Sequence, residues 1–427
     1  MGAYLMATPA VMPSFSDSDR AELAQEADAL IQRLRLHGRG EDGSVTRLVY
    51  TGAWQGAMAE IEEWFHAAGL RVRADAVGSR FGRLSGDSPG VVLSGSHIDS
   101  VVRGGAYDGV LGVVMAGSAV QWLAAAFGRP KRTIEVLANC EEESSRFSCN
   151  FWGGRAMTGR ILEGEPDRLT DSQGVSIGAA MRACGLDPER IPEAHRYDLV
   201  AFVEPHIEQG PVLAAAGDVI GVVDQVVGVR GLSVSIQGAA GHAGTIPMAR
   251  RRDALTGAAE VVLGAERIAK EQGAPAVATV GHLTVEPGGF NQVPGSADFT
   301  IDFRHPNEAT LDRFEDSLLR MLQKVASGRE LEAHTRPLIG QPGIRFDDRI
   351  CGCLETACQE AGVAWRRMPS HAGHDAQLLG SICPAAMLFV PSQGGHSHRP
   401  DEYTEVAHIG YGIEVLARTL FRLAYQD

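Results

Sequence analysis

Imidazole and carboxylate side chains are concentrated in one short segment, residues 95–108. The apolar run at 91–93 has the composition of a buried strand, and it delivers His97 and Asp99 at its carboxyl end. Residues two apart in an extended segment share a face, so one of these can bind a metal ion while the other fixes the imidazole tautomer. A glycine pair then turns the chain and brings Asp108 back toward them. Such side chains at a strand end are what a two-metal hydrolytic site requires.

Three consecutive glutamates, Glu141, Glu142 and Glu143, follow a second apolar strand. Adjacent carboxylates are costly to bury unless water solvates them or cations neutralise them. A solvated acidic turn is one interpretation of this run. The other is a metal ion beside Glu143 and a reacting water beside Glu142, where a carboxylate within hydrogen-bond reach can act as general base.

Two further histidines lie in turns rich in glycine and proline, His206 in residues 204–210 and His398 in residues 394–402. A single histidine is usually structural. In a chain that already holds a candidate metal cluster, these two are better candidates for ligands. His396 competes with His398, and spacing alone does not choose between them.

A second group of polar residues lies between positions 238 and 305. His242 is in a glycine loop, and Asn291 comes shortly before a Pro-Gly turn. Asp302 and Arg304 alternate along one predicted strand, so they share a face. Arg304 could bind a substrate carboxylate through two hydrogen bonds or form an internal salt bridge with Asp302, and the sequence leaves both open.

The elements that must position the first group form a β-α-β unit, with a strand at 91–96, a helix at 112–127 and a strand at 133–139. This order predicts a parallel sheet covered by helices, in which functional residues gather at the carboxyl ends of the strands. A third strand at 199–203 directly precedes His206. Amphipathic helices are expected at 19–37, with a capping box made by Asp19 and Glu22, and at 54–68.

A different order begins near Gly217. From 219 to 336 the chain predicts alternating elements in a βαββαβ order, the split βαβ arrangement: strand 232–237, helix 253–270, strands 276–283 and 297–304, helix 309–322 and strand 331–335. Segments of α/β type resume at 337. The expected fold is therefore α/β, with a catalytic domain in two parts, 1–218 and 337–427, and an inserted ferredoxin-like α+β domain at 219–336.

Composition sets further limits. A chain of 427 residues exceeds one ordinary core. Its formal charge of −14 argues against nucleic acid or an anionic membrane surface as a partner. No uninterrupted apolar stretch approaches the roughly 20 residues of a membrane span. Seven cysteines without a C-x-x-C pair are typical of free thiols in a reducing compartment, so a cytoplasmic location is expected.

Together these motifs resemble the hydantoinase/carbamoylase branch of the di-metal amidohydrolase superfamily that also holds aminoacylases and carboxypeptidase-like enzymes. The resemblance covers nearly the whole chain and rests on four motifs: residues 95–113, 142–147, 206–210 and 397–402. The third motif has His206 where peptidase relatives use a carboxylate, which favours an amidohydrolase over a peptidase. The last motif selects His398 over His396.

The resemblance implies a ligand set. One metal ion would be held by His97, Asp108 and His206. The other would be held by Asp108, Glu143 and His398, with Asp108 bridging the two. Two divalent ions per subunit are expected. Zinc is the first expectation, and manganese, cobalt and nickel also suit histidine and carboxylate ligands.

The resemblance also implies roles around the metals. Glu142 would be the general base, and Asp99 would orient His97. The positions that match substrate-binding residues of the family are Gln209, His242, Asn291, Arg304 and His374, with His242 also assisting catalysis. His371 departs from the pattern, because relatives often carry a small residue there. The inserted domain resembles the family's lid and dimerisation domain, so a homodimer is expected, with His242 and Asn291 reaching the neighbouring subunit's site.

The expected reaction is hydrolysis of the ureido bond of N-carbamoyl-L-amino acids to amino acid, ammonia and carbon dioxide. Allantoate, ureidoglycolate or N-carbamoyl-β-alanine are the alternative substrates, since each combines a carboxylate with a ureido group. An aminoacylase or a dipeptidase is disfavoured by His206. A catalytically silent homologue would have lost Glu142 or a ligand, and neither is lost.

Overall fold

The structure is a computed structural model that describes residue 12 and residues 15–426, and it divides into two compact units. The larger unit holds the chain up to Asp224, Phe346–Met368 and the chain from Gly373 onward, and the smaller unit holds Gln225–Arg345 and Pro369–Ala372. These limits differ from the expected 219 and 336. The physical reason differs at the two ends: β6 (Ile220–Val226) begins just after the expected first boundary and runs through the observed one, and β12 (Glu332–Gln341) runs through the expected second boundary.

The pairing of each strand explains why the limits of the units differ from the expected ones. The first half of β6 pairs with a strand of the larger unit, so the change of unit falls within β6. Strand β12 continues to Gln341, past the end at 335 that the sequence predicted, with a register shift between Pro337 and Ile339. A proline is tolerated there because β12 is at the edge of its sheet and one side of it needs no ladder hydrogen bonds.

A mixed sheet forms the centre of the larger unit and has nine strands over the described residues, in the order β1-β2-β4-β3-β5-β15-β6-β13, with β14 on β6. The central four strands are parallel and the outer pairings are antiparallel. The remaining bounds are β1 (Arg71–Ala74), β2 (Arg80–Leu84), β3 (Ser88–His97), β4 (Arg132–Asn139), β5 (Leu199–Ile207), β13 (Ile344–Arg345), β14 (Trp365–Ser370) and β15 (Ala385–Val390). The expected mostly parallel centre is therefore present.

Helices cover this sheet. The long ones are α1 (Asp17–Arg35), α2 (Gly52–Ala67), α3 (Val110–Phe127), α10 (Asp348–Ala361) and α12 (Val406–Ala424). Shorter helices lie in the loops: α4 (Trp152–Met157), α5 (Glu165–Arg168), α6 (Ile177–Ala183), α7 (Val212–Ala216) and α11 (Asp375–Leu379). The start of α1 differs from the prediction, because the capping box is made by Ser16 and Asp19 rather than by Asp19 and Glu22.

By length and composition alone, helix α3 is apolar enough to cross a membrane. The sequence has no uninterrupted apolar run there, because polar residues and glycines interrupt the helix. Two thirds of it is buried, and it packs between β3 and the helices α1 and α12. Its apolar character is therefore explained by its place in the core of a globular unit.

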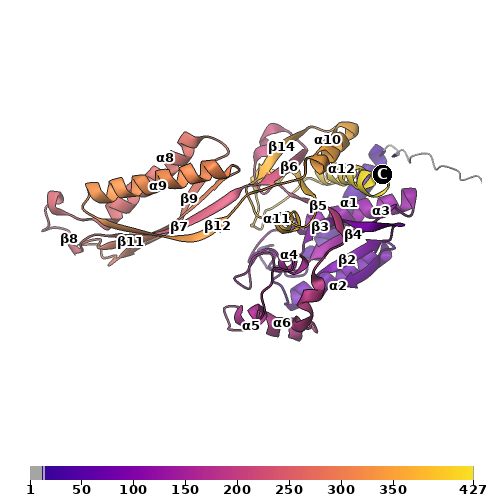
Figure 1. The fold of residues 1–427 in the computed structure, drawn as a ribbon, viewed down its shortest axis with the longest axis horizontal. Helices are drawn as coiled ribbons and strands as arrows, with labels where there is room; N and C mark the ends of the chain where they lie inside the picture. The colour runs from indigo at the N-terminus through magenta and orange to yellow at the C-terminus, as the bar shows by residue number, and fades with distance from the viewer. Residues whose placement is uncertain (1–11, 13–14, 427) are drawn as a thin grey trace, which may run out of the picture. The chain divides into compact units, whose positions relative to one another are not determined.

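The smaller unit is a two-layer α+β structure. Its antiparallel sheet has the order β12-β7-β11-β9, and α8 (Ala254–Gln272) and α9 (Glu308–Gly328) lie along one face of it (Figure 1). The other strands are β7 (Gly228–Gln237), β9 (Val277–Glu286) and β11 (Ser296–His305), with a short ladder between β8 (Gly241–His242) and β10 (Gln292–Val293). This is the predicted βαββαβ order.

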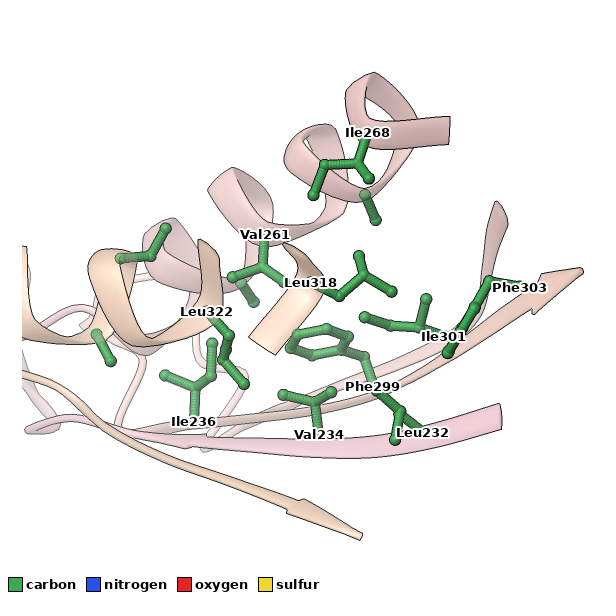
Figure 2. Packing of buried hydrophobic residues seen from close by; sticks show 14 of the residues in the cluster. Leu232, Val234, Ile236, Val261, Ile268, Phe299, Ile301, Phe303, Leu318 and Leu322 are labelled. Carbon is green, nitrogen blue, oxygen red and sulfur yellow. The ribbon is translucent and has the colours of Figure 1, made fainter. Parts of the chain in front are cut away.

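A continuous apolar core joins the two layers of the smaller unit. Figure 2 shows Val261, Ile268, Leu318 and Leu322 pointing from the helices toward the strands. The alternating residues that meet them from β7 and β11 are Leu232, Val234, Ile236, Phe299, Ile301 and Phe303. The opposite side chains of these strands, Asp302 and Arg304 among them, are left outside this core.

Candidate active site

The carboxyl ends of the four parallel strands bring the candidate residues of the larger unit together. His97 is the last residue of β3, and the glutamate run directly follows β4. His206 lies inside β5, one residue before its end, rather than after the strand as predicted. His398 lies in the loop after β15. Because β4, β3, β5 and β15 are neighbours in the sheet, these side chains meet at one edge, as the sequence predicted.

One group of three converging atoms is formed by His97, Asp108 and His206, all buried. The Nε2 atoms of the two histidines are 3.5 Å apart, and they lie 3.4 Å and 3.2 Å from Oδ1 of Asp108. Nδ1 of His206 is 2.9 Å from the carbonyl oxygen of Ile207, which requires a proton on Nδ1. Nδ1 of His97 likewise faces acceptor oxygens of Asp99. In its neutral form, each imidazole therefore turns the lone pair of Nε2 toward the same point.

The other carboxylate oxygen of Asp108 belongs to a second group of three. Nε2 of His398 lies 3.3 Å from Oδ2 of Asp108 and 3.3 Å from Oε1 of Glu143. His396 is paired with Asp401 instead and stays outside the group. Asp108 thus presents one oxygen to each group, which is the arrangement of a carboxylate that bridges two cations.

These donor sets fit divalent metal ions. Histidine nitrogens and carboxylate oxygens bound at about 2.0–2.1 Å to one tetrahedral ion lie about 3.3 Å apart, which matches the distances in both groups. Oδ1 of Asp108 and Oε1 of Glu143 are buried without a hydrogen-bond partner among the described residues. Such atoms are costly to bury unpaired, and a cation in each group would satisfy them.

The pKa shifts of the three histidines also favour cation binding. Burial opposes charge on His97 and His206, yet the Asp108 carboxylate beside them raises the pKa of His206, and raises that of His97 well above its ordinary value. The same carboxylate raises the pKa of the more exposed His398 to about 10. Protons and metal ions use the same lone pairs. A site that attracts protons this strongly carries negative charge that a cation would neutralise.

Asp99 contacts His97, and it also positions the backbone of the glutamate run. Its Oδ1 accepts a hydrogen bond from the backbone N–H of Glu142 at 3.0 Å, and its Oδ2 accepts one from that of Glu143 at 3.2 Å. A carboxylate oxygen of Glu142 lies within 4.8 Å of ligand atoms of His97 and Glu143. Burial raises the pKa of Glu142 well above its usual range. Glu142 therefore combines proximity to both groups with a carboxyl that readily accepts a proton.

Glu141 has a structural role. It is buried, and its carboxylate accepts hydrogen bonds from the backbone N–H groups of Ser144 and Trp152. These bonds hold the loop after β4 in place. The run is therefore neither a solvated acidic turn nor three equivalent carboxylates, because each glutamate has its own environment.

Residues of the last sequence motif, 397–402, fix the position of Asp108 by hydrogen bonds. Oε1 of Glu402 accepts hydrogen bonds from the backbone N–H groups of Tyr107 and Asp108 at 2.8 and 2.9 Å. The hydroxyl of Ser397 donates to Oδ2 of Asp108 at 2.7 Å. Gly109 follows with a positive φ of 67°, and a Cβ there would lie 2.5 Å from the His97 ring. A glycine is therefore required where the chain turns past the imidazole.

Gln209 lies with the candidate metal ligands. Its Nε2 donates to Oδ2 of Asp108 at 2.8 Å and is 3.4 Å from Nε2 of His398. Gln209 and His398 both adopt positive φ, 60° and 57°. Non-glycine residues in that region are strained, and such strain clusters at functional sites. Both strained residues thus lie beside the bridging carboxylate.

A second layer of buried polar residues lies behind the candidate ligands. The resemblance already put Asp375 near the site, but the sequence reasoning gave no role to Glu204 or Asn139. Glu204 accepts hydrogen bonds from the hydroxyl of Ser96 at 2.8 Å and from the backbone N–H of Ala376 at 2.7 Å. Asp375 accepts one from the side chain of Asn139 at 2.6 Å. Burial raises the pKa of Asp375 to about 8. The signal available was Glu204 itself, a charged residue within an otherwise apolar strand.

His374 is buried beside His206, with ring centroids 4.6 Å apart. Burial, aided by His206, lowers the pKa of His374 well below its ordinary value, so the ring is neutral. A neutral imidazole at this place offers a hydrogen bond without adding charge. The structure therefore places His374 next to a candidate ligand, as the sequence predicted from its motif.

The three remaining candidates lie in the smaller unit. The pairing of β8 with β10 brings His242 and Asn291 close, and both are exposed. Nδ1 of His242 accepts a hydrogen bond from the backbone N–H of Gly244 at 3.0 Å, which leaves Nε2–H as a donor. Nε and Nη2 of Arg304 donate to the two carboxylate oxygens of Asp302 at 2.9 and 3.1 Å. The internal salt bridge left open by the sequence is thus present.

Arg304 still has donors to offer. A guanidinium carries five N–H groups. Two of them are used by Asp302, and a third, on Nη1, donates to the carbonyl oxygen of His371 at 2.6 Å. Three of the five N–H groups are therefore used, and one N–H group remains on Nη1 and one on Nη2. That is the number a carboxylate takes in a bidentate contact.

The comparisons with known proteins agree with this geometry. Residues 93–422 match the model of peptidase family M20/M25/M40. An allantoate amidohydrolase of Bacillus subtilis is 38% identical over 397 residues, which is 92% of this chain and 96% of that protein. An N-carbamoyl-L-amino-acid amidohydrolase of Paenarthrobacter aurescens is 39% identical over 405 residues, 94% and 97% of the two chains.

A solved structure is similar to this chain as well. The hydantoinase/carbamoylase family amidase of Burkholderia multivorans superimposes with a TM-score of 0.89 at 31% identity, covering 95% of this chain and 98% of that one. The family is dinuclear metal-dependent, and this chain has histidine and carboxylate groups placed to bind metal. The protein is a hydrolase of carbon–nitrogen bonds in linear amides, and it belongs to peptidase family M20/M25/M40, in the branch of the hydantoinase/carbamoylase amidohydrolases.

Proposed function

We propose that the enzyme hydrolyses the ureido bond of N-carbamoyl-L-amino acids to amino acid, ammonia and carbon dioxide. The observation that carries the proposal is the position of Asp108, whose two oxygens each face a separate set of converging donor atoms with Glu142 close by. A relative 39% identical to this chain is named for that activity.

The residues that would hold the metals are the two groups around Asp108: His97 and His206 on one side, and Glu143 and His398 on the other. Two divalent cations bound there would supply Lewis-acid activation of a water and of the substrate carbonyl. Zinc is the first candidate, and manganese, cobalt and nickel suit the same donors.

Proton transfer is the task of Glu142. Its carboxylate takes a proton from the attacking water and passes it to the leaving nitrogen, which leaves as an amine or as ammonia. The raised pKa of Glu142 suits both steps, since the group must hold the proton between them. Asp99 keeps the Glu142 backbone in place during the transfer.

The proposal also assigns residues to substrate binding. Arg304 takes the substrate carboxylate with its two remaining N–H groups. His242, through Nε2–H, and Asn291 donate hydrogen bonds to the oxyanion that develops at the carbonyl carbon. His374 and Gln209 contact the ureido group. In this proposal residues 225–345 act as the lid and as the dimerisation domain.

Allantoate is the second candidate substrate. Relatives named allantoate amidohydrolase, from Bacillus subtilis and from Escherichia coli, are 38% and 37% identical to this chain. Allantoate combines a carboxylate with a ureido group on one carbon, so the same residues would bind it. Ureidoglycolate and N-carbamoyl-β-alanine share this chemistry. Aminoacylase or dipeptidase activity is disfavoured, because His206 replaces the carboxylate that the peptidase relatives use.

A homodimer through the smaller unit is part of the proposal. The outer edge of β9 has no partner strand among the residues described, and Val277 and Leu283 on β9 are exposed. On the other edge strand, β12, Leu338 and Ile339 are exposed as well. Unpaired edges with apolar side chains favour pairing with a second copy. His242 and Asn291 would then act in the partner's site.

The test is release of ammonia by the metal-reconstituted enzyme on a matched panel. The panel contains N-carbamoyl-L-amino acids, N-carbamoyl-β-alanine, allantoate and ureidoglycolate. N-acetyl amino acids and dipeptides are included too, with free amino acid measured for these last two. Turnover of carbamoyl amino acids above allantoate supports the proposal. A preference for allantoate moves the assignment to the second candidate, and cleavage of dipeptides alone contradicts both.

A further inference from the structure

His371 has a defined environment beside Arg304. It lies in the smaller unit and is half-buried. The turn that carries it is held by two hydrogen bonds: the hydroxyl of Ser370 donates to the carbonyl of Ala372 at 2.9 Å, and the N–H of Ala372 donates back at 3.1 Å. The ring is therefore carried on a fixed backbone.

The backbone of His371 is tied to Arg304. Its carbonyl oxygen accepts the hydrogen bond from Nη1 of Arg304. A carboxylate that uses the two remaining N–H groups of Arg304 is thus bound next to the residue that carries this imidazole. A substituent on the carbon beside that carboxylate would then come within reach of His371.

The His371 ring has an unmet hydrogen-bonding group. Its Nδ1 is buried and has no hydrogen-bond partner in the part of the chain that the structure describes. Burial first, and then the charges of Arg304 and His305, lower the pKa of His371, so the ring is neutral at neutral pH. The imidazole therefore adds a hydrogen-bonding atom beside Arg304 and adds no second positive charge. A buried polar atom left unpaired is unfavourable, and a ligand group that pairs with it removes that cost.

We propose that His371 is a specificity determinant that selects substrates whose α-carbon carries a hydrogen-bonding substituent. This inference rests on the proposed function, since it concerns carboxylates that bear a ureido group. A second ureido group, a carboxamide or a hydroxyl would pair with Nδ1. An aliphatic side chain would leave Nδ1 buried and unpaired. One neutral hydrogen bond of this kind corresponds to a preference of about ten-fold in kcat/KM.

The test compares pairs of substrates that differ in polarity but little in shape. N-carbamoyl-L-asparagine is set against N-carbamoyl-L-leucine, and N-carbamoyl-L-serine against N-carbamoyl-L-alanine, with the full-length, metal-reconstituted enzyme. The variants are His371→Ala, which removes the ring, and His371→Asn, whose amide reaches about where Nδ1 lies. His334→Ala is the matched control, because His334 is an exposed histidine of the same unit.

The wild type and His334→Ala are expected to prefer the polar member of each pair by about ten-fold. His371→Ala loses that preference, and His371→Asn keeps most of it. Equal losses on both members of a pair in His371→Ala would mean that the ring is only structural and would overturn the inference. Turnover without discrimination in the wild type overturns it as well. Absence of any ureido turnover overturns the proposed function, and this inference with it.

Discussion

The carboxylate of Asp99 accepts a hydrogen bond from the backbone N–H of Glu142 at 3.0 Å. Asp99 also faces Nδ1 of His97. One buried carboxylate thus sets the tautomer of a candidate metal ligand and the position of the candidate general base. The two functions that hydrolysis needs, a metal site and a proton acceptor, are linked through a single side chain.

Asp99→Asn should therefore weaken both functions. The amide nitrogen would face a backbone N–H group or the N–H of His97, and donors do not pair with donors. We expect a loss of about 10- to 100-fold in metal affinity or in kcat/KM, as is usual for residues that orient metal ligands. Titration with the metal and steady-state kinetics measure the two effects. Asp253→Asn, at the partly exposed N-cap of α8, is the matched control. Equal metal affinity and kcat/KM in the two variants would show that Asp99 has neither role.

Asp108→Asn tests the bridge. Because both groups of donors use an oxygen of Asp108, loss of its charge should reduce the metal content at both positions together, along with activity. Elemental analysis after dialysis against metal measures this. Asp401→Asn, an exposed residue of the same loop as His398, should bind metal as the wild type does. Loss of only one ion from Asp108→Asn would mean that the two sites are independent.

Mixed dimers test whether His242 acts across a subunit interface. Glu142→Gln and His242→Ala should each be nearly inactive alone. Mixing them under conditions that exchange subunits should restore about a quarter of wild-type activity, since half of the dimers are mixed and each has one intact site. No recovery, with exchange demonstrated by mass spectrometry, would place His242 in the site of its own subunit.

The cysteines should be poorly reactive. All seven are free, and burial raises the pKa of each thiol, to about 12 for Cys149, Cys351, Cys358 and Cys383. A thiol reagent at pH 8 should react slowly with the native enzyme and rapidly with seven thiols in denaturant. Cys184 and Cys353 are only partly buried and should react first. Rapid inactivation by the reagent would contradict this.

The convergence of the candidate metal ligands could be predicted because strand ends follow local rules, whereas the choice of His398 over His396 came from the family resemblance. Strand ends in a parallel sheet converge, so an apolar run followed by His97 or by the glutamates already places those side chains at one edge. The turn that returns Asp108 is encoded by glycines close by. The βαββαβ order of the smaller unit could likewise be predicted from a local signal, the hydrophobic periodicity of each segment.

The parts that were not predicted depend on contacts between distant segments. The bond from Gln209 to Asp108 and the pairing of Asn139 with Asp375 join residues 101 and 236 positions apart. No local pattern records such contacts. The limits of the units were missed for a related reason, since β6 and β12 continue without a break in composition where their packing partners change.

The most direct test of the central claim is Glu142→Gln, with ammonia release and metal content measured on the same sample. We predict full metal occupancy, because the proposed mechanism assigns proton transfer and not metal binding to Glu142, and a loss of about 10²- to 10⁴-fold in kcat on the best ureido substrate. Near-wild-type turnover with the metals in place would show that Glu142 does not carry the proton, and the proposed mechanism would be wrong.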